Sequence, residues 1–202
     1  MIKKIIIILI IFNITNIVKA STKNEIIINL KKIKNISFDF KQTVDDKMEE
    51  GTCTIQYPKK IYCSYNNFKK KIIVSNGKSL VIKNQTTNQS FLYPLRKTPL
   101  NLLLDKDFLL NGIINSEEKI VNDKYYNFSL KNKDHKINIF FDKNSNDLVG
   151  WQTEDLYQNL AVTYIYNIKK NNKIDKKIFR LPWFYKLILI NSDLNIFIPL
   201  EI

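Results

Sequence analysis

Few side chains in this sequence could perform chemistry. His135 is the only histidine among 202 residues, and Cys53 and Cys63 are the only cysteines. Three soft ligands cannot complete a four-ligand zinc site. A lone histidine in the polar segment 133–136 also gives a hydrolase no suitable base. The acidic segment 45–50 is interpreted as a solvated turn. We therefore predict no catalytic residue, no metal site, no cofactor and no enzyme activity.

The positive charge needs a separate interpretation. The formal net charge is +13, but only Arg96 and Arg180 are arginines and the lysines are scattered along the chain. Nucleic-acid-binding proteins favour arginine and clustered basic patches, so no nucleic-acid partner is predicted. The short runs 69–71 and 169–170 indicate a solvated basic surface, and attraction to anionic membranes is the alternative interpretation.

The first twenty residues have the layout of a secretory signal peptide. Lys3 and Lys4 precede the apolar run 5–12, and Val18 and Ala20 supply the small residues of a cleavage site. The run is too short for a good membrane span. Residue 21 is serine, so there is no cysteine for lipidation at the new terminus. We expect residues 1–20 to be cleaved and the mature protein to be exported and soluble.

The elements that must position any site are mostly strands. Helical spacing predicts a helix over 22–34, with Thr22 as N-cap and Glu25 closing a capping box. A second helix is predicted from Thr98 as N-cap, with Pro99 at its first position. Period-two alternation and turn residues predict an antiparallel meander with one solvated face. Its strands are expected at 36–41, 51–57, 61–65, 72–75, 78–83, 89–95, 125–130, 136–141, 148–155 and 160–168.

The two cysteines fall in neighbouring strands of this meander. If paired residue numbers sum to 116, Cys53 lies directly opposite Cys63 and a disulfide can form. A sum of 118 makes them diagonal neighbours, and a two-residue loop at 58–59 places them on opposite faces. A disulfide and two buried free thiols both remain open.

An ordered set of short motifs carries a resemblance to a known family. The motifs are Phe40-Lys41-Gln42, Gly51, Tyr57-Pro58, the run from Ile73 to Leu80, Tyr93-Pro94-Leu95, Thr98-Pro99-Leu100 with Leu103-Leu104, and Leu148-Val149-Gly150-Trp151. From about residue 22 to Pro182 the chain resembles the periplasmic outer-membrane lipoprotein carrier family, LolA, especially its alphaproteobacterial members. The resemblance implies an α+β fold, mainly β: a curved antiparallel sheet forming an incomplete β-barrel, with a helical lid on its concave side.

The resemblance also implies a function. Members of the family bind the acyl chains of lipoproteins in an apolar cavity and carry them from an inner-membrane ABC-type releasing complex to an outer-membrane acceptor. They are not enzymes, and we expect a monomer. The residues expected to line the cavity are Phe38, Phe40, Ile55, Tyr57, Ile61, Tyr65, Ile73, Leu80, Ile82, Phe91, Tyr93, Leu95, Leu100, Leu103, Leu104 and Trp151.

Two departures from the family pattern bear on these expectations. The family usually places a basic residue, associated with movement of the lid, where this chain has Tyr57. The apolar tail 183–202, which follows the carrier domain 21–182, is more hydrophobic than the family's usual C-terminal end. The tail is interpreted as an extra strand pair, with a divergent end or a membrane- or partner-contacting segment as alternatives. The rival function is a periplasmic lipid- or peptide-sensing adaptor with the same half-barrel.

Overall fold

One curved antiparallel sheet organises the computed structural model, which describes residues 22–154, 159–182 and 188–189. The predicted signal peptide lies outside the described residues, and so does the tail 183–202 apart from 188–189. The first strands are β1 Asn35–Val44, β2 Lys47–Gln56, β3 Lys60–Tyr65, β4 Lys71–Asn76, β5 Ser79–Asn84 and β6 Ser90–Pro94. The remaining strands are β7 Lys119–Val121, β8 Tyr125–Lys131, β9 Lys136–Asp142, β10 Leu148–Glu154, β11 Leu160–Lys170 and β12 Ile188–Leu189.

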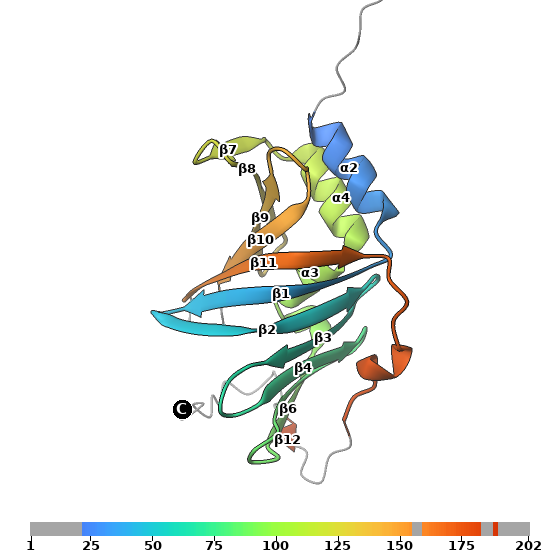
Figure 1. Ribbon diagram of the computed structural model, residues 1–202, viewed down its shortest axis with the longest axis vertical. Helices are drawn as coiled ribbons and strands as arrows, with labels where there is room; N and C mark the ends of the chain where they lie inside the picture. The colour runs from blue at the N-terminus through green and yellow to red at the C-terminus, as the bar shows by residue number, and fades with distance from the viewer. Residues whose placement is uncertain (1–21, 155–158, 183–187, 190–202) are drawn as a thin grey trace, which may run out of the picture.

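The strand order leaves the sheet unclosed. It runs β12-β6-β5-β4-β3-β2-β1-β11-β10-β9-β8-β7, so β1 joins two antiparallel meanders by pairing with both β2 and β11. Among the described strands, only the two-residue β12 pairs in parallel, beside β6. Register shifts occur between β1 and β11 and between β9 and β10. Such bulges raise the local twist, and the sheet curls around one face (Figure 1). The predicted incomplete barrel is confirmed.

The helices lie against the concave face of this sheet. They are α2 Thr22–Lys32, α3 Leu100–Leu104 and α4 Lys106–Asn115, with the short 3-10 turn η1 Leu95–Lys97. A second 3-10 turn, η2 Lys176–Phe179, lies against β3 and β4. Figure 1 shows α2 and α4 side by side. Their buried residues join the sheet in one hydrophobic core. The covered face of the sheet is therefore the apolar one.

Two lysines fix α2 against α4. The Nζ of Lys23 donates to the carbonyl oxygens of Ile114, at 3.1 Å, and Ser116, at 2.6 Å, at the end of α4. The Nζ of Lys106 donates to the carbonyl oxygens of Lys31, at 2.6 Å, and Ile33, at 2.7 Å, at the end of α2. Each cation meets the carbonyls that a helix leaves unpaired at its C-terminus. The two helices are thus clamped at both ends.

Several local predictions were wrong. Residues 47–50 belong to strand β2, because their backbone pairs with residues 41–44 of β1, and Lys41 also forms an ion pair with Glu50 at 3.1 Å. The α2 helix already includes Thr22, so Thr22 is not its N-cap, and the carboxylate of Glu25 accepts from Asn146 at 2.8 Å. The hydroxyl of Thr98 donates to the carbonyl of Leu95 at 2.8 Å, so it does not cap α3.

Helix α4 was not predicted from the sequence. Asp105 forms its N-cap and accepts from the amide of Phe108 at 3.1 Å. Leu109 and Ile113 bury one stripe of the helix, at i and i+4. At Gly112, an added Cβ would lie 2.8 Å from the side chain of Leu130 in β8. The glycine therefore lets α4 approach the sheet closely.

Candidate functional site

The residues of strands β1 to β6 that were predicted to line a cavity all lie on one face of the sheet. Directly opposed residues in an antiparallel pair point to the same side, and the registers link them into rows across the strands. One row consists of Phe38, Cys53, Cys63, Ile73, Ile82 and Phe91. A second row consists of Ile36, Ile55, Ile61, Ser75, Leu80 and Tyr93. A third, shorter row consists of Phe40, Gly51 and Tyr65.

These rows differ in burial from the centre to the edge. Phe38, Phe40 and Ile55 are almost fully buried in the core near the centre of the sheet. Towards the β6 edge, Ile82 and Phe91 are only half-buried and lie outside the main core cluster. The packed interior therefore thins out towards this edge.

Cys53 and Cys63 are directly opposite, which is the register with a sum of 116. A disulfide bond joins them in the structure, with Cα atoms 4.1 Å apart. The bridge ties β2 to β3 within the first row. The bridge lies between Phe38 and Ile73 in that row, so the disulfide itself forms part of the interior wall.

Trp151 belongs to the same interior, from the other half of the sheet. It lies opposite Ile139 of β9 and Thr163 of β11, and only 7% of its surface is exposed. Its ring meets that of Phe38 edge to face, with centroids 6.0 Å apart. The two meanders therefore meet through an aromatic contact.

Sequence reasoning missed a large part of this interior. The second meander and α4 contribute side chains that the motif-based list omitted: Phe108, Leu109, Ile113, Phe128, Leu130, Ile137, Ile139 and Phe141. Alternation of apolar and polar residues in 126–130 and 137–141 was a usable signal for most of them.

The short helix α3 fills the space between the sheet and the other helices. Leu102, Leu103 and Leu104 expose 2%, 0% and 0% of their surfaces, and Leu100 is half-buried against the same core. Three consecutive leucines cannot share one helical stripe, so α3 is surrounded by apolar neighbours on more than one side. The leucines of α3 therefore occupy the interior themselves.

The end of α3 is tied to the turn between β2 and β3. The backbone amide of Lys59 donates to the carbonyl oxygen of Leu104 at 2.9 Å. The Nζ of Lys59 pairs with the carboxylate of Asp105 at 3.0 Å, with both side chains partly exposed. The hydroxyl of Ser75, which is fully buried, donates to the carbonyl of Lys59 at 3.0 Å. One backbone bond and one ion pair thus connect the lid to a fixed turn.

Tyr57 occupies the position where the family usually has a basic residue. Burial raises the pKa of its phenol, which stays neutral at physiological pH. A cation does lie nearby, because Lys106 Nζ is 5.8 Å from the centroid of the Tyr57 ring. That lysine is bound to the end of α2, and burial lowers its pKa.

Polar groups line one end of the interior. The hydroxyl of Tyr65 donates to Gln42 at 3.3 Å, and the Gln42 amide donates to the hydroxyl of Thr163 at 3.0 Å. Burial also raises the pKa of Tyr65. These groups satisfy one another, so they add no charge to the apolar space.

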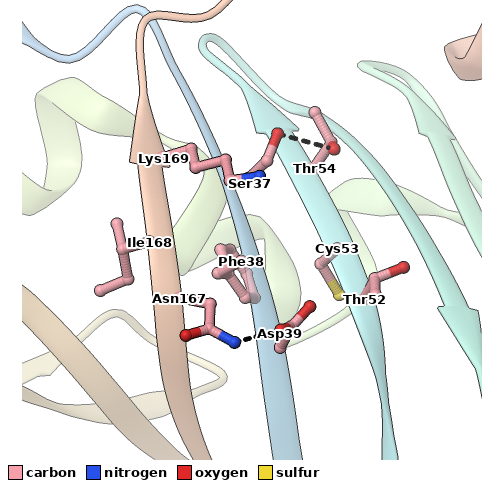
Figure 2. Close-up of a pocket in the computed structure, with 9 residues that line it drawn as sticks. All are labelled: Ser37, Phe38, Asp39, Thr52, Cys53, Thr54, Asn167, Ile168 and Lys169. Atoms are coloured by element: carbon pink, nitrogen blue, oxygen red, sulfur yellow. Dashed lines mark hydrogen bonds between the residues drawn. The ribbon is translucent and has the colours of Figure 1, made fainter.

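A surface depression of about 490 Å³ lies at the bulge between β1 and β11 (Figure 2). Its polar groups pair with one another: Asn167 donates to Asp39 at 2.7 Å, and the hydroxyls of Ser37 and Thr54 are 3.0 Å apart. A smaller depression of about 300 Å³ next to α3 is lined by Lys59, Gly77, Lys78, Pro94, Arg96 and Asn101. Neither depression is the apolar interior.

A side-chain contact joins His135 to the backbone of η1. Its Nε2 lies 3.3 Å from the carbonyl oxygen of Lys97 in η1, which links the β8–β9 turn to the segment before α3. Among the described residues, no group of three histidine, cysteine or acidic side chains could hold a metal ion. No described helix has both the length and the hydropathy to cross a membrane.

A curved, unclosed sheet whose apolar face is covered by a tethered leucine helix has the architecture of a half-barrel. The family described as outer membrane lipoprotein carrier protein LolA matches residues 31–182. The chain therefore belongs to the LolA family, whose members are carriers rather than enzymes. No curated protein sequence matches the chain.

Several solved structures are similar to this chain at low sequence identity. An uncharacterized conserved protein from Thermus thermophilus is 9% identical with a TM-score of 0.50, over 84% of this chain and 99% of that one. A LolA superfamily protein from Nitrosomonas europaea is 12% identical with a TM-score of 0.42, over 80% and 99%. The MucA/MucB complex of Pseudomonas aeruginosa contains a chain that is 8% identical with a TM-score of 0.44, over 81% and 62%.

Proposed function

We propose that this protein is a periplasmic carrier that binds the acyl chains of lipoproteins between its sheet and its α3 lid. It takes them from an inner-membrane ABC-type releasing complex and delivers them to an outer-membrane acceptor. Residues 1–20 are its cleaved export signal, and residues 21–182 form the carrier domain. The observation that carries the proposal is the burial of three successive leucines of α3 in an apolar interior, with one backbone bond and one ion pair at the end of the helix.

The physical need for such a lid follows from the cargo. Each acyl methylene removed from water contributes about 0.8 kcal/mol, so a bare acyl chain does not cross an aqueous compartment. An empty apolar cavity has the same difficulty, because its walls lose their packing contacts. Leucines that fill the interior when cargo is absent, and withdraw when it enters, remove both problems.

The wall of the acyl site is proposed to be the interior face of the first meander together with α3. The strongest candidates are the centrally buried Phe38, Phe40 and Ile55, with Leu103 and Leu104 as the residues displaced by cargo. Tyr57, Ile73, Tyr93 and Leu100, which are half-buried against the core, form the rim. Cargo is expected to enter past this rim, because moving half-buried side chains requires a smaller rearrangement than moving fully buried ones.

The test is purification of the exported protein from the periplasm, followed by mass spectrometry of the material that co-purifies. We expect acylated peptides or intact lipoproteins. A second assay adds the purified protein to inner-membrane vesicles and measures lipoprotein release. Bound signalling lipids or unacylated peptides, with no release from vesicles, would instead support a periplasmic sensing adaptor and contradict the carrier proposal.

A further inference from the structure

The tip of the β3–β4 hairpin exposes an aromatic ring between polar surroundings. Phe68 has 89% of its surface in water, more than any other large hydrophobic residue in the described part of the chain. Lys69 and Lys70 follow it and are also exposed. Exposure of one apolar side chain is ordinary, but a ring at a turn next to two cations is a specific arrangement.

The hairpin holds this tip in place from within. The amide of Lys70 donates to the carbonyl of Asn67 at 2.9 Å, and the amide of Lys71 donates to the Asn67 side chain at 3.2 Å. The Asn67 side chain in turn donates to Glu49 of β2 at 2.8 Å. These bonds close the turn and anchor it to the neighbouring strand.

A second hairpin supports the tip from the other side. The hydroxyl of Thr86, in the turn between β5 and β6, donates to the carbonyl oxygen of Phe68 at 3.1 Å. The backbone at Phe68 is therefore fixed while its ring points away from the protein. Little backbone conformational entropy therefore remains to be lost when the ring meets a partner.

The charges at the tip are unbalanced. Lys71 is bound to Glu49 and lies over the Tyr65 ring, 3.9 Å from its centroid, so neither Lys71 nor Glu49 leaves a free charge. Among the described residues, no ion pair involves Lys69 or Lys70. Asp45 and Asp46, at the same end of the sheet, belong to the separate β1–β2 turn. Two positive charges therefore flank the exposed ring.

We propose that this hairpin tip docks the protein on the anionic surface of a phospholipid bilayer. The Phe68 ring enters the boundary between headgroups and acyl chains, and Lys69 and Lys70 contact lipid phosphates. Aromatic rings favour that boundary, and lysines reach the phosphates with extended side chains. A single ring with two flexible cations matches a deformable charged surface better than a protein groove, which requires a larger complementary area.

This interaction goes beyond cargo binding, because it involves no residue of the interior. The tip lies at the opposite end of β3 from Lys59, which holds the lid (Figure 1). Docking through the tip therefore leaves the contact between Lys59 and Leu104 uncovered. The protein can touch a membrane while its lid remains free to move.

The first experiment measures co-sedimentation of the cargo-free protein with cargo-free vesicles of phosphatidylglycerol and phosphatidylethanolamine. We expect Phe68→Ser to weaken binding about tenfold. Lys69→Gln with Lys70→Gln should weaken it about fivefold per lysine at low salt. Phosphatidylcholine vesicles should bind the wild type weakly. The matched control is Lys176→Gln with Lys177→Gln in η2, which removes the same charge from exposed lysines elsewhere.

The control should bind within about twofold of wild type, because lysines away from the tip make no lipid contact. Equal losses in the tip and control variants would show a diffuse effect of net charge and overturn the proposal. The proposal would also be overturned if the triple variant Phe68→Ser, Lys69→Gln and Lys70→Gln bound the vesicles as well as wild type does. Since neither vesicles nor protein carry cargo, these outcomes do not depend on whether the acyl-carrier proposal is correct.

The second experiment tests insertion directly. Phe68→Trp should gain a blue-shifted fluorescence component with anionic vesicles, and brominated lipids should quench it. The wild-type protein, which keeps the tryptophans at 151 and 183, provides the background. Binding of Phe68→Trp without a shift or quenching would show that another surface contacts the bilayer, which would refute docking through this hairpin. Absence of binding to any vesicle, with capture of an acidic protein instead, would replace the lipid surface with a protein partner.

Discussion

Truncation of Leu103 tests whether α3 is a displaceable lid or a permanent part of the core. The Leu103 side chain exposes none of its surface, so Leu103→Ala should destabilise the closed protein by about 3 kcal/mol, a typical value for a buried leucine. Under the proposed function, the open, cargo-binding form has already withdrawn this side chain. The substitution therefore penalises the closed form alone and raises the population of the open form.

The expected consequence is tighter binding from a less stable protein. A shift of about 3 kcal/mol in the closed-to-open equilibrium can raise apparent affinity by up to roughly a hundredfold, until the open form predominates. The assay is fluorescence titration with a labelled long-chain acyl peptide, with urea unfolding of the same preparation. The control is Val81→Ala, because Val81 is also fully buried but lies outside the main core cluster.

Val81→Ala should lower the free energy of unfolding by about 2 kcal/mol and leave acyl affinity unchanged. If Leu103→Ala loses stability while its affinity stays constant or falls, the α3 leucines are permanent core residues. The reasoning about the lid would then be refuted. If both variants gain affinity equally, general loosening of the fold explains the gain, and α3 has no special role.

Three other contacts of the domain can be tested in the same way. Asp105→Asn should keep the α4 N-cap, since asparagine caps as well as aspartate, but should lose the ion pair with Lys59. Acyl affinity should rise about twofold to fivefold at low salt, and the difference from wild type should vanish at high salt. Reduction of the Cys53–Cys63 bridge should lower the free energy of unfolding by about 2–3 kcal/mol in urea titrations, and alkylation of denatured protein should find no free thiol before reduction. Gly51→Ala should destabilise by about 3 kcal/mol, because its Cβ would lie 2.1 Å from the Ser64 carbonyl oxygen; a change below about 0.5 kcal/mol would contradict this close approach.

The strands could be predicted from sequence because each carries its own signal. Alternation fixes which residues share a face, and the turn at Gly77, with φ of 102°, fixes the β4–β5 hairpin. The even-sum register at Cys53 and Cys63 follows from burial of both apolar sets on one side. Local periodicity therefore determined most of the sheet and the orientation of its residues.

Burial on the other face was not predictable in the same way. Ile72, Val74 and Val81 are buried although they lie outside the main core. For Ile72 and Val74 the cover is η2, which has a buried Phe179 and lies against β3 and β4. That cover comes from a segment about one hundred residues away in sequence. No local pattern indicates such a contact, so alternation alone assigned these positions to the solvated face.

The lid was recognised as a helix, but its surroundings were not. The spacing of Leu100, Leu103 and Leu104 predicts one apolar stripe, whereas Leu102 is equally buried. The reason is that α4, which was not predicted, follows α3 directly and packs against it. A five-residue helix has no stable face of its own, and its packing depends on elements that a linear pattern does not place.

The arrangement of α3 explains how a carrier could bind strongly enough to protect an acyl chain and still release it. A long chain transferred into the interior gains on the order of 10 kcal/mol from its methylenes. Exposure of Leu102, Leu103 and Leu104 would cost about 2–3 kcal/mol each, and the ion pair of Lys59 with Asp105 adds less than about 1 kcal/mol. The difference leaves only a few kcal/mol of net binding. An acceptor with a slightly better apolar site can then remove the cargo, because the leucines return to the interior as the chain leaves.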